Sequence, residues 1–222
     1  MKFTRTLIAL SAATLMATSA MAMEPAEYKA AKDQISADYK ANKQKCDALQ
    51  GNAKDVCQKE AKGAEKVAKA ELDARYKTSD KAAYKARVAK ADADYEVAKE
   101  KCDDLSGNAK DVCVKDAKAA HVSAKENAKV ARAAAKPADN TAAKQADVAE
   151  ARKDAAAEKN EANYKAAKER CDALSGDAKS KCVDDAKRVH GQNCPRHCPW
   201  GRWPLRWGPA MRCWPNPPSK RR

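Results

Sequence analysis

Six of the nine cysteines lie in three similar segments, and their type and spacing could support chemistry. The segments are KCDALQGNAKDVC, KCDDLSGNAKDVC and RCDALSGDAKSKC, which begin at Lys45, Lys101 and Arg170. In each segment, two cysteines lie eleven positions apart around a central glycine. Such a pair could form a structural disulfide, a redox-active dithiol or part of a metal site.

A structural disulfide fits this spacing best. On an unbroken helix, residues eleven apart are separated by about 16 Å along the axis, too far for a bond. If the chain turns at the glycine, antiparallel helices bring the cysteines level, at the roughly 5.5 to 6 Å between Cα atoms that a disulfide needs. The spacing therefore predicts three bridges, which are Cys46 with Cys57, Cys102 with Cys113 and Cys171 with Cys182.

Metal binding and thiol redox exchange are the alternative uses of these cysteines. Structural zinc takes four ligands, whereas each segment has two cysteines and no histidine; His121, beyond Cys113, is expected to be solvated. Redox motifs use the shorter C-x-x-C spacing. The sequence contains no glycine-rich phosphate loop and no Ser/His/Asp constellation. We predict no enzyme activity, cofactor or metal, and a periplasmic thiol redox or metal-handling protein is the alternative.

The residues at the centre of each segment predict how the two helices of a hairpin end and begin. The central glycines suit a left-handed C-cap of the incoming helix, and they are Gly51, Gly107 and Gly176. The residues that follow can cap the outgoing helix, and they are Asn52, Asn108 and Asp177. The third segment has Ser180 where the others have an acid three positions after the cap, so its turn is predicted to be the weakest.

Long helices are predicted to position the cysteines. Alanine, lysine and glutamate are strong helix formers, and residues 23–190 contain no tryptophan or phenylalanine from which to build a thick core. Apolar residues step by three and four along one stripe, as in Tyr84, Val88, Ala91, Tyr95, Ala98 and Cys102. A tyrosine lies seven positions before the first cysteine of each segment, which indicates a repeated unit.

The predicted fold is therefore all-α, with three tandem antiparallel helical hairpins, each stapled by one disulfide. The hairpins are expected at residues 23–77, 78–136 and 137–190, with connecting segments at Lys77 to Asp80 and Lys136 to Thr141. They could form an elongated array or a loose bundle with coiled-coil packing. Their relative arrangement and the oligomeric state are left open.

The first 22 residues are typical of a cleaved secretory signal peptide. Lys2 and Arg5 precede an apolar run from Leu7 to Ala17, and Ala20-Met21-Ala22 forms a small-residue cleavage site. The run is shorter than the roughly 20 residues of a membrane-spanning helix. We therefore expect export to the periplasm, where disulfides can form, and no integral membrane segment after cleavage.

The net charge of +14 is concentrated at the two ends of the chain. Of the 45 lysines and arginines, two lie in residues 1–22 and seven in residues 191–222, while all 31 acidic residues lie between these ends. The interleaved charges of the middle region are typical of solvated helix faces and disfavour nucleic-acid binding. The expected partners are anionic envelope components, either lipid or wall polymer, or envelope proteins.

Residues 191–222 are predicted to form a disordered tail unrelated to the hairpins. This tail holds all four tryptophans and seven of the nine prolines. The composition favours an out-of-frame reading of GC-rich DNA from near Val189, in which case Cys194, His197 and Cys198 have no metal role. The competing interpretation is a cationic, tryptophan-rich, membrane-active segment.

The cysteine segments resemble those of a known family. Tyr-Lys-Ala-Ala-Lys-Glu-Arg-Cys, from Tyr164 to Cys171, is followed by Asp-Ala-Leu-Ser-Gly-Asp-Ala-Lys. This motif resembles that of an uncharacterised family of proteobacterial periplasmic proteins rich in alanine and lysine, and the resemblance covers residues 1–190. Members are often labelled as cell-envelope biogenesis proteins similar to TolA, whose membrane anchor and globular end are not expected here. We expect a non-enzymatic helical protein that is structural, envelope-associated or stress-protective.

Overall fold

The computed structural model describes residues 23–137 and 140–192. Within these ranges the chain forms six α-helices and no strand. They are α1 (Pro25–Cys46), α2 (Gly51–Lys77), α3 (Asp80–Lys101), α4 (Gly107–Ala135), α5 (Thr141–Cys171) and α6 (Gly176–Val189), with a short 3₁₀ helix, η1 (Cys102–Asp104), between α3 and α4. The predicted all-α class is confirmed. The expected signal peptide and the sequence from residue 193 onward lie outside the described residues.

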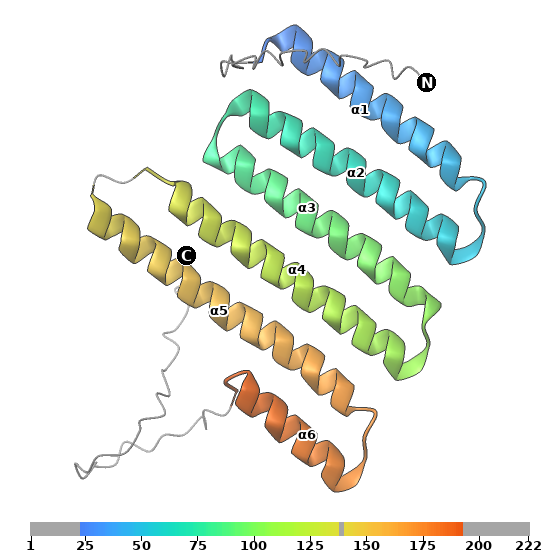
Figure 1. Ribbon diagram of the computed structural model, residues 1–222, viewed down its shortest axis with the longest axis vertical. Helices are drawn as coiled ribbons and strands as arrows, with labels where there is room; N and C mark the ends of the chain where they lie inside the picture. Colours follow the sequence, from blue (N-terminus) through green and yellow to red (C-terminus); the bar gives the residue numbers. More distant parts are fainter. Residues whose placement is uncertain (1–22, 138–139, 193–222) are drawn as a thin grey trace, which may run out of the picture.

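The six helices lie side by side in one layer (Figure 1). The extensive contacts all join helices that follow each other in the chain. We call α1 with α2 hairpin 1, α3 with α4 hairpin 2, and α5 with α6 hairpin 3. The three stapled turns lie on one edge of the layer, and the α2–α3 and α4–α5 connections lie on the other (Figure 1). Of the two expected arrangements, the structure therefore has the elongated array.

The hairpins pack against one another through two junctions. We define a junction as the contact between consecutive hairpins, which is α2 against α3 or α4 against α5, and these two helix pairs have the most extensive contacts. At the first junction, a Cβ placed on Gly63 would lie 3.0 Å from Cβ of Ala93. The missing side chain of Gly63 therefore lets α2 and α3 approach closely.

Small side chains fill most of the space between the helices. Leu72 is the largest fully buried side chain in the described part of the chain, and it is 1% exposed. Most other buried residues are alanines, among them Ala61, Ala82, Ala91, Ala117, Ala119, Ala128, Ala155 and Ala166. Because the hydrophobic gain scales with buried area, each alanine contributes little. A single layer packed in this way depends on additional cross-links.

Local sequence determines where the helices after the junction loops begin. The Ser79 hydroxyl accepts a hydrogen bond from the Ala82 N–H at 3.2 Å, and Asn140 Oδ1 accepts one from the Ala143 N–H at 2.6 Å. Both residues are extended N-caps whose side chains satisfy a free N–H of the first turn. Thr78 adopts φ +41° as α2 ends. These caps agree with the connecting segments predicted at Lys77 to Asp80 and at Lys136 to Thr141.

Candidate functional site

The six paired cysteines form the three predicted disulfides. The Cα atoms of Cys46 and Cys57 are 5.5 Å apart, and those of the other two pairs are 5.7 Å apart. The first cysteine of each pair is at most 1% exposed; Cys46 and Cys171 end α1 and α5, and Cys102 directly follows α3. Each bridge therefore connects the last turn of one helix to the second turn of the next. The first cysteine of every bridge is buried within its hairpin.

The central glycine of each stapled turn has the expected left-handed conformation but a different role. The φ angles are +56°, +55° and +56° at Gly51, Gly107 and Gly176. Each glycine begins the outgoing helix, whereas the incoming helix α1 already ends at Cys46, so the predicted C-cap role is wrong. Gln50, the residue before Gly51, has an extended backbone. Because glycine has no Cβ, it can adopt the positive φ that turns the chain into the helix without steric strain.

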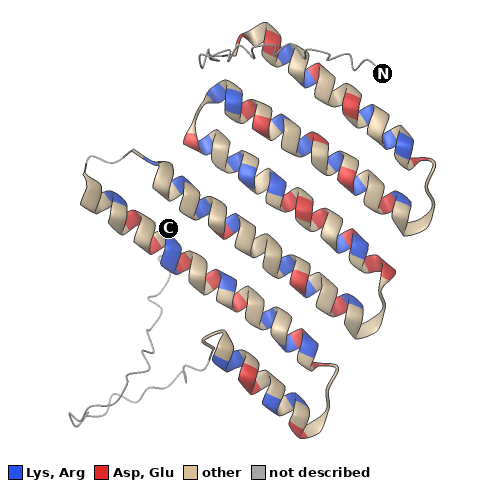
Figure 2. Ribbon diagram, viewed as in Figure 1, with Lys and Arg blue, Asp and Glu red and all other residues tan. Residues whose placement is uncertain are grey.

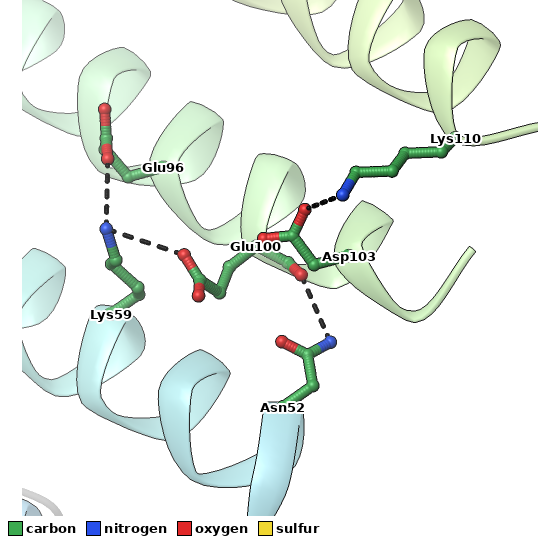
Figure 3. Close-up of polar contacts among 6 residues, drawn as sticks. All are labelled: Asn52, Lys59, Glu96, Glu100, Asp103 and Lys110. Carbon is green, nitrogen blue, oxygen red and sulfur yellow. Dashed lines mark hydrogen bonds and ion pairs between the residues drawn. The ribbon is translucent and has the colours of Figure 1, made fainter. Parts of the chain in front are cut away.

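The residues predicted to cap the outgoing helices do not occupy the cap position. That position is held by Gln50, Ser106 and Ser175, none with a side-chain capping bond. Asn52 Nδ2 instead donates to the main-chain oxygen of Glu100 at 3.2 Å (Figure 3). Glu100 lies in the last turn of α3, and its main-chain oxygen also faces the N–H of Cys102, the residue that caps this helix. The capping prediction failed because the asparagine serves the neighbouring hairpin.

The second junction has the same asparagine contact. Asn108 Nδ2 donates to the main-chain oxygen of Glu169 at 3.1 Å. Asn52 and Asn108 each lie five positions before the second cysteine of a segment, and Glu100 and Glu169 each lie two positions before the first. Asp177 holds the corresponding position of hairpin 3. It makes no such contact, because in the described chain no further helix packs against α6.

An ion pair closes each stapled turn next to its disulfide. The nitrogen–oxygen distances are 3.4, 2.9 and 2.8 Å for Lys54–Asp47, Lys110–Asp103 and Lys179–Asp172. Figure 3 shows the second of these pairs. The hydrogen bond from Lys179 lowers the pKa of Asp172. These ion pairs were not predicted from the sequence. An aspartate directly after the first cysteine and a lysine three positions before the second occur in all three segments, and this recurrence was the available signal.

Two further pairs of charged residues recur across both junctions. Lys59 lies 3.5 Å from carboxylate oxygens of Glu96 and Glu100 (Figure 3). At the second junction, Lys115 lies 3.4 Å from Glu169. Partial desolvation opposes the charge of Lys59, but Glu100 and Glu96 raise its pKa overall. At the neighbouring positions the two charges are exchanged between the helices, so that the acid belongs to the first helix and the base to the second. These pairs are Lys101 with Glu60 at 2.9 Å and Arg170 with Asp116.

Aromatic rings connect the helices of hairpins 1 and 2 near the opposite edge. Tyr28 of α1 stacks on Tyr76 of α2 with ring centroids 4.4 Å apart, and its hydroxyl donates to Asp73 at 2.5 Å. This hydrogen bond raises the pKa of Tyr28, and it lowers the pKa of Asp73 together with Lys77. In hairpin 2, Arg132 lies 5.1 Å from the ring centroid of Tyr84. The bridges of hairpins 1 and 2 are therefore each complemented by an aromatic contact at the far end of the hairpin.

His121 was expected to be solvated, and this expectation was wrong. Its side chain is 13% exposed, its Nε2 lies 2.6 Å from Asp92 Oδ1, and its ring stacks on Tyr95 at 4.7 Å between centroids. Lys118 lies 5.7 Å from the centroid of the same tyrosine. Asp92 and Tyr95 are one turn apart on α3, so a histidine arriving from α4 meets both at once. The cluster joins the two helices of hairpin 2.

Two grooves of about 600 Å³ each are lined in part by α2 and α3, and Gly63 and Ala93 contribute to both. One is polar, extends from α1 to α4, and is lined by Tyr39, Lys43, Lys62, Lys66, Asp92 and His121 among others. The second groove is less polar, and its lining includes Ala64, Val67, Ala68, Val97 and Ala98. No group of three or more potential metal ligands occurs in residues 23–137 and 140–192.

No protein family model, curated protein or solved structure matches this chain. Among the described helices, none is both long enough and apolar enough to cross a membrane.

Proposed function

We propose that this chain is a non-enzymatic periplasmic protein, exported through a cleaved signal peptide, that acts as a structural spacer or scaffold associated with the cell envelope. A stress-protective role belongs to the same proposal. The repeated, coiled-coil-like hairpins would supply a stiff surface, in keeping with the resemblance to alanine- and lysine-rich periplasmic proteins. Anionic lipid, wall polymer or envelope proteins are the proposed partners.

The single-layer array is the observation that carries this proposal. Because each helix packs on its chain neighbours, both faces of the layer remain available for contact. Charges of both signs occur on all six helices (Figure 2). Such mixed surfaces favour weak contacts with several partners over one deep binding pocket. Disulfides suit a protein that must keep its shape in an oxidising compartment.

Three exposed leucines provide a specific contact edge for envelope association. Leu49, Leu105 and Leu174 are 41%, 44% and 44% exposed, and each lies three positions after the first cysteine of its segment. The stapled turns that carry them share one edge of the layer (Figure 1). With Val189, they are the exposed large apolar residues of the described chain. A row of apolar side chains along a flat edge fits a flat lipid or protein surface.

Sedimentation with isolated envelopes tests this function. The mature chain and a version ending at residue 192 are mixed with envelope fractions at low and high salt, and bound protein is quantified. We expect both versions to sediment at low salt, because the proposed contacts lie within the described hairpins. A Leu49→Ser, Leu105→Ser, Leu174→Ser variant should bind several-fold less. Complete recovery of the parent protein in the supernatant at low salt would refute envelope association.

A further inference from the structure

The outer side of α6 differs from the corresponding sides of α2 and α4. These three helices begin with matching cysteine segments, but only α2 and α4 have another hairpin packed on their outer side within the described chain. Corresponding positions can be compared by counting from the second cysteine of each segment, which is Cys57, Cys113 or Cys182. Most of the residues that form the two junctions are replaced by residues of another type in α6.

A junction requires a small residue six positions after the second cysteine. This position is Gly63 in α2, which meets Ala93, and Ala119 in α4, which is 7% exposed. In α6 the same position is Arg188, whose side chain is 71% exposed. An arginine there would overfill a contact in which even one added Cβ already comes within 3.0 Å of a neighbour.

The hydrogen-bond donor of the junction is also missing from α6. Asn52 and Asn108 each donate an amide proton to a main-chain oxygen of the next hairpin. Asp177 stands at this position in α6. An ionised carboxylate only accepts hydrogen bonds, so it would meet that main-chain oxygen without a shared proton. The exchange therefore converts an attractive contact into a repulsive one.

One of the two junction charges is inverted in α6 as well, whereas Asp185 keeps the acidic character of Glu60 and Asp116. Lys59 and Lys115 pair with glutamates across the two junctions, whereas the corresponding residue of α6 is Asp184. Asp184 pairs with Lys187 at 3.0 Å, and Asp185 pairs with Arg188 at 2.8 Å, both within α6. These charges are satisfied locally, without a neighbouring hairpin.

The outer side of α1 has one matching change. The junction glutamates Glu100 and Glu169 lie two positions before the first cysteines, and α1 has Gln44 there. A second copy placed beyond α6 in the same register would therefore find Gln44 where the inner junctions have a carboxylate. Lys45 keeps the basic character of Lys101 and Arg170. Both ends of the array thus depart from the junction pattern, and α6 departs further.

We infer that α6 is a capping helix, whose Asp177, Asp184 and Arg188 prevent a second copy of this chain from docking on the end of the array. Terminal units of stacked helical proteins need a polar outer face, because an open junction surface would add further units. Specificity against such association is obtained by placing mismatched charges and oversized side chains where partners would meet. The inference goes beyond the proposed function, since it concerns array length and not the envelope partner.

Restoring the junction residues tests this inference. The variant Asp177→Asn, Asp184→Lys, Arg188→Ala with Gln44→Glu gives both ends the residue types of the inner junctions. Oxidised mature protein is examined by sedimentation velocity over a concentration series, with circular dichroism as a check on folding. We expect the parent to sediment as one species. The restored variant should show a weight-average sedimentation coefficient that rises with concentration.

A matched control identifies the contact responsible. The same three α6 substitutions are combined with Gln44→Lys, which puts two positive charges opposite each other at the new contact. This protein should sediment like the parent. The inference is overturned if the restored variant stays monomeric, if the control associates equally, or if the parent itself associates with cross-links from α6 to α1. These results are independent of envelope binding, so the two proposals can fail separately.

Discussion

Individual side chains connect the two helices of hairpins 1 and 2 away from the disulfides, and the sequence did not predict the partners in several of these contacts. The stripe that contains Tyr84 and Tyr95 was predicted from apolar spacing, and both rings do meet α4. Which polar group each ring meets was not predictable, because Arg132 and His121 lie far along the chain. Spacing indicates which face of a helix packs, but the partner depends on how two helices are aligned.

The hydroxyl of Tyr28 gives hairpin 1 a pH-dependent contact. Its hydrogen bond lowers the pKa of Asp73, so the folded state favours the carboxylate. The resulting stability is present above the unfolded pKa of about 3.9 and is lost as pH falls through the lowered pKa of the folded state. We expect Tyr28→Phe to lower the urea midpoint at pH 7, and the gap from the parent to narrow below about pH 4.

Urea unfolding followed by circular dichroism at pH 7, 5 and 3 measures this effect. Tyr39→Phe is the control, because the Tyr39 hydroxyl makes no hydrogen bond in the described part of the chain and its removal should leave the midpoint nearly unchanged at every pH. An equal gap between Tyr28→Phe and the parent at pH 3 and pH 7 would show that the carboxylate is not the group involved.

At the scale of elements, the sequence predicts the pairing of helices well and their ends less well. In each segment the two cysteines lie five positions from a central Gly-Asn or Gly-Asp pair, and this symmetry identified each hairpin and its disulfide, because only a turn at that point can bring the cysteines together. The cap assignments at Asn52 and Asn108 failed because their partners lie 48 and 61 residues away. Local propensity contains no information about such distant main-chain oxygens.

The disulfide of hairpin 1 should stabilise its helices more locally than that of hairpin 2. α1 packs on α2 alone, whereas α3 and α4 each have a second neighbour. Replacing both cysteines of a bridge by serine is expected to cost about 2–3 kcal/mol of unfolding free energy, because a short loop is no longer closed in the unfolded chain. In the Cys46→Ser, Cys57→Ser variant, α1 should lose amide protection while α3 and α4 keep it.

Hydrogen exchange with peptide-level mass spectrometry, together with urea unfolding, distinguishes the two bridges. The Cys102→Ser, Cys113→Ser variant is the matched comparison, and its loss of protection should extend over both α3 and α4. If removal of either bridge reduced protection equally along the whole chain, the hairpins would unfold as one unit, and the local role assigned to the first bridge would be wrong.

At the scale of the whole molecule, contacts between successive helices make stability a property of neighbours. Hairpins 1 and 3 share no extensive contact, so each affects the stability of the other only through hairpin 2. In such linear arrays, the total stability is close to the sum of each unit and its interfaces. The array is therefore expected to lose hairpin 3 before the rest if the second junction alone is weakened. The three hairpins were predictable, but their order in one layer depends on Asn52, Asn108 and the charge pairs beside them.

The variant Asn108→Ala, Asp116→Ala tests this coupling by removing the hydrogen bond to Glu169 and the ion pair with Arg170. We expect a loss of about 1–2 kcal/mol, given roughly 1 kcal/mol for the hydrogen bond and at most about that for an exposed pair. Hydrogen exchange should then show α5 and α6 opening earlier than α1 to α3.

Lys90→Ala, which removes an exposed ion pair with Asp94 inside α3, serves as the control and should leave hydrogen exchange nearly unchanged. Simultaneous loss of protection in all six helices would mean that the array unfolds as a single cooperative unit, because a purely nearest-neighbour structure confines the change to the weakened end.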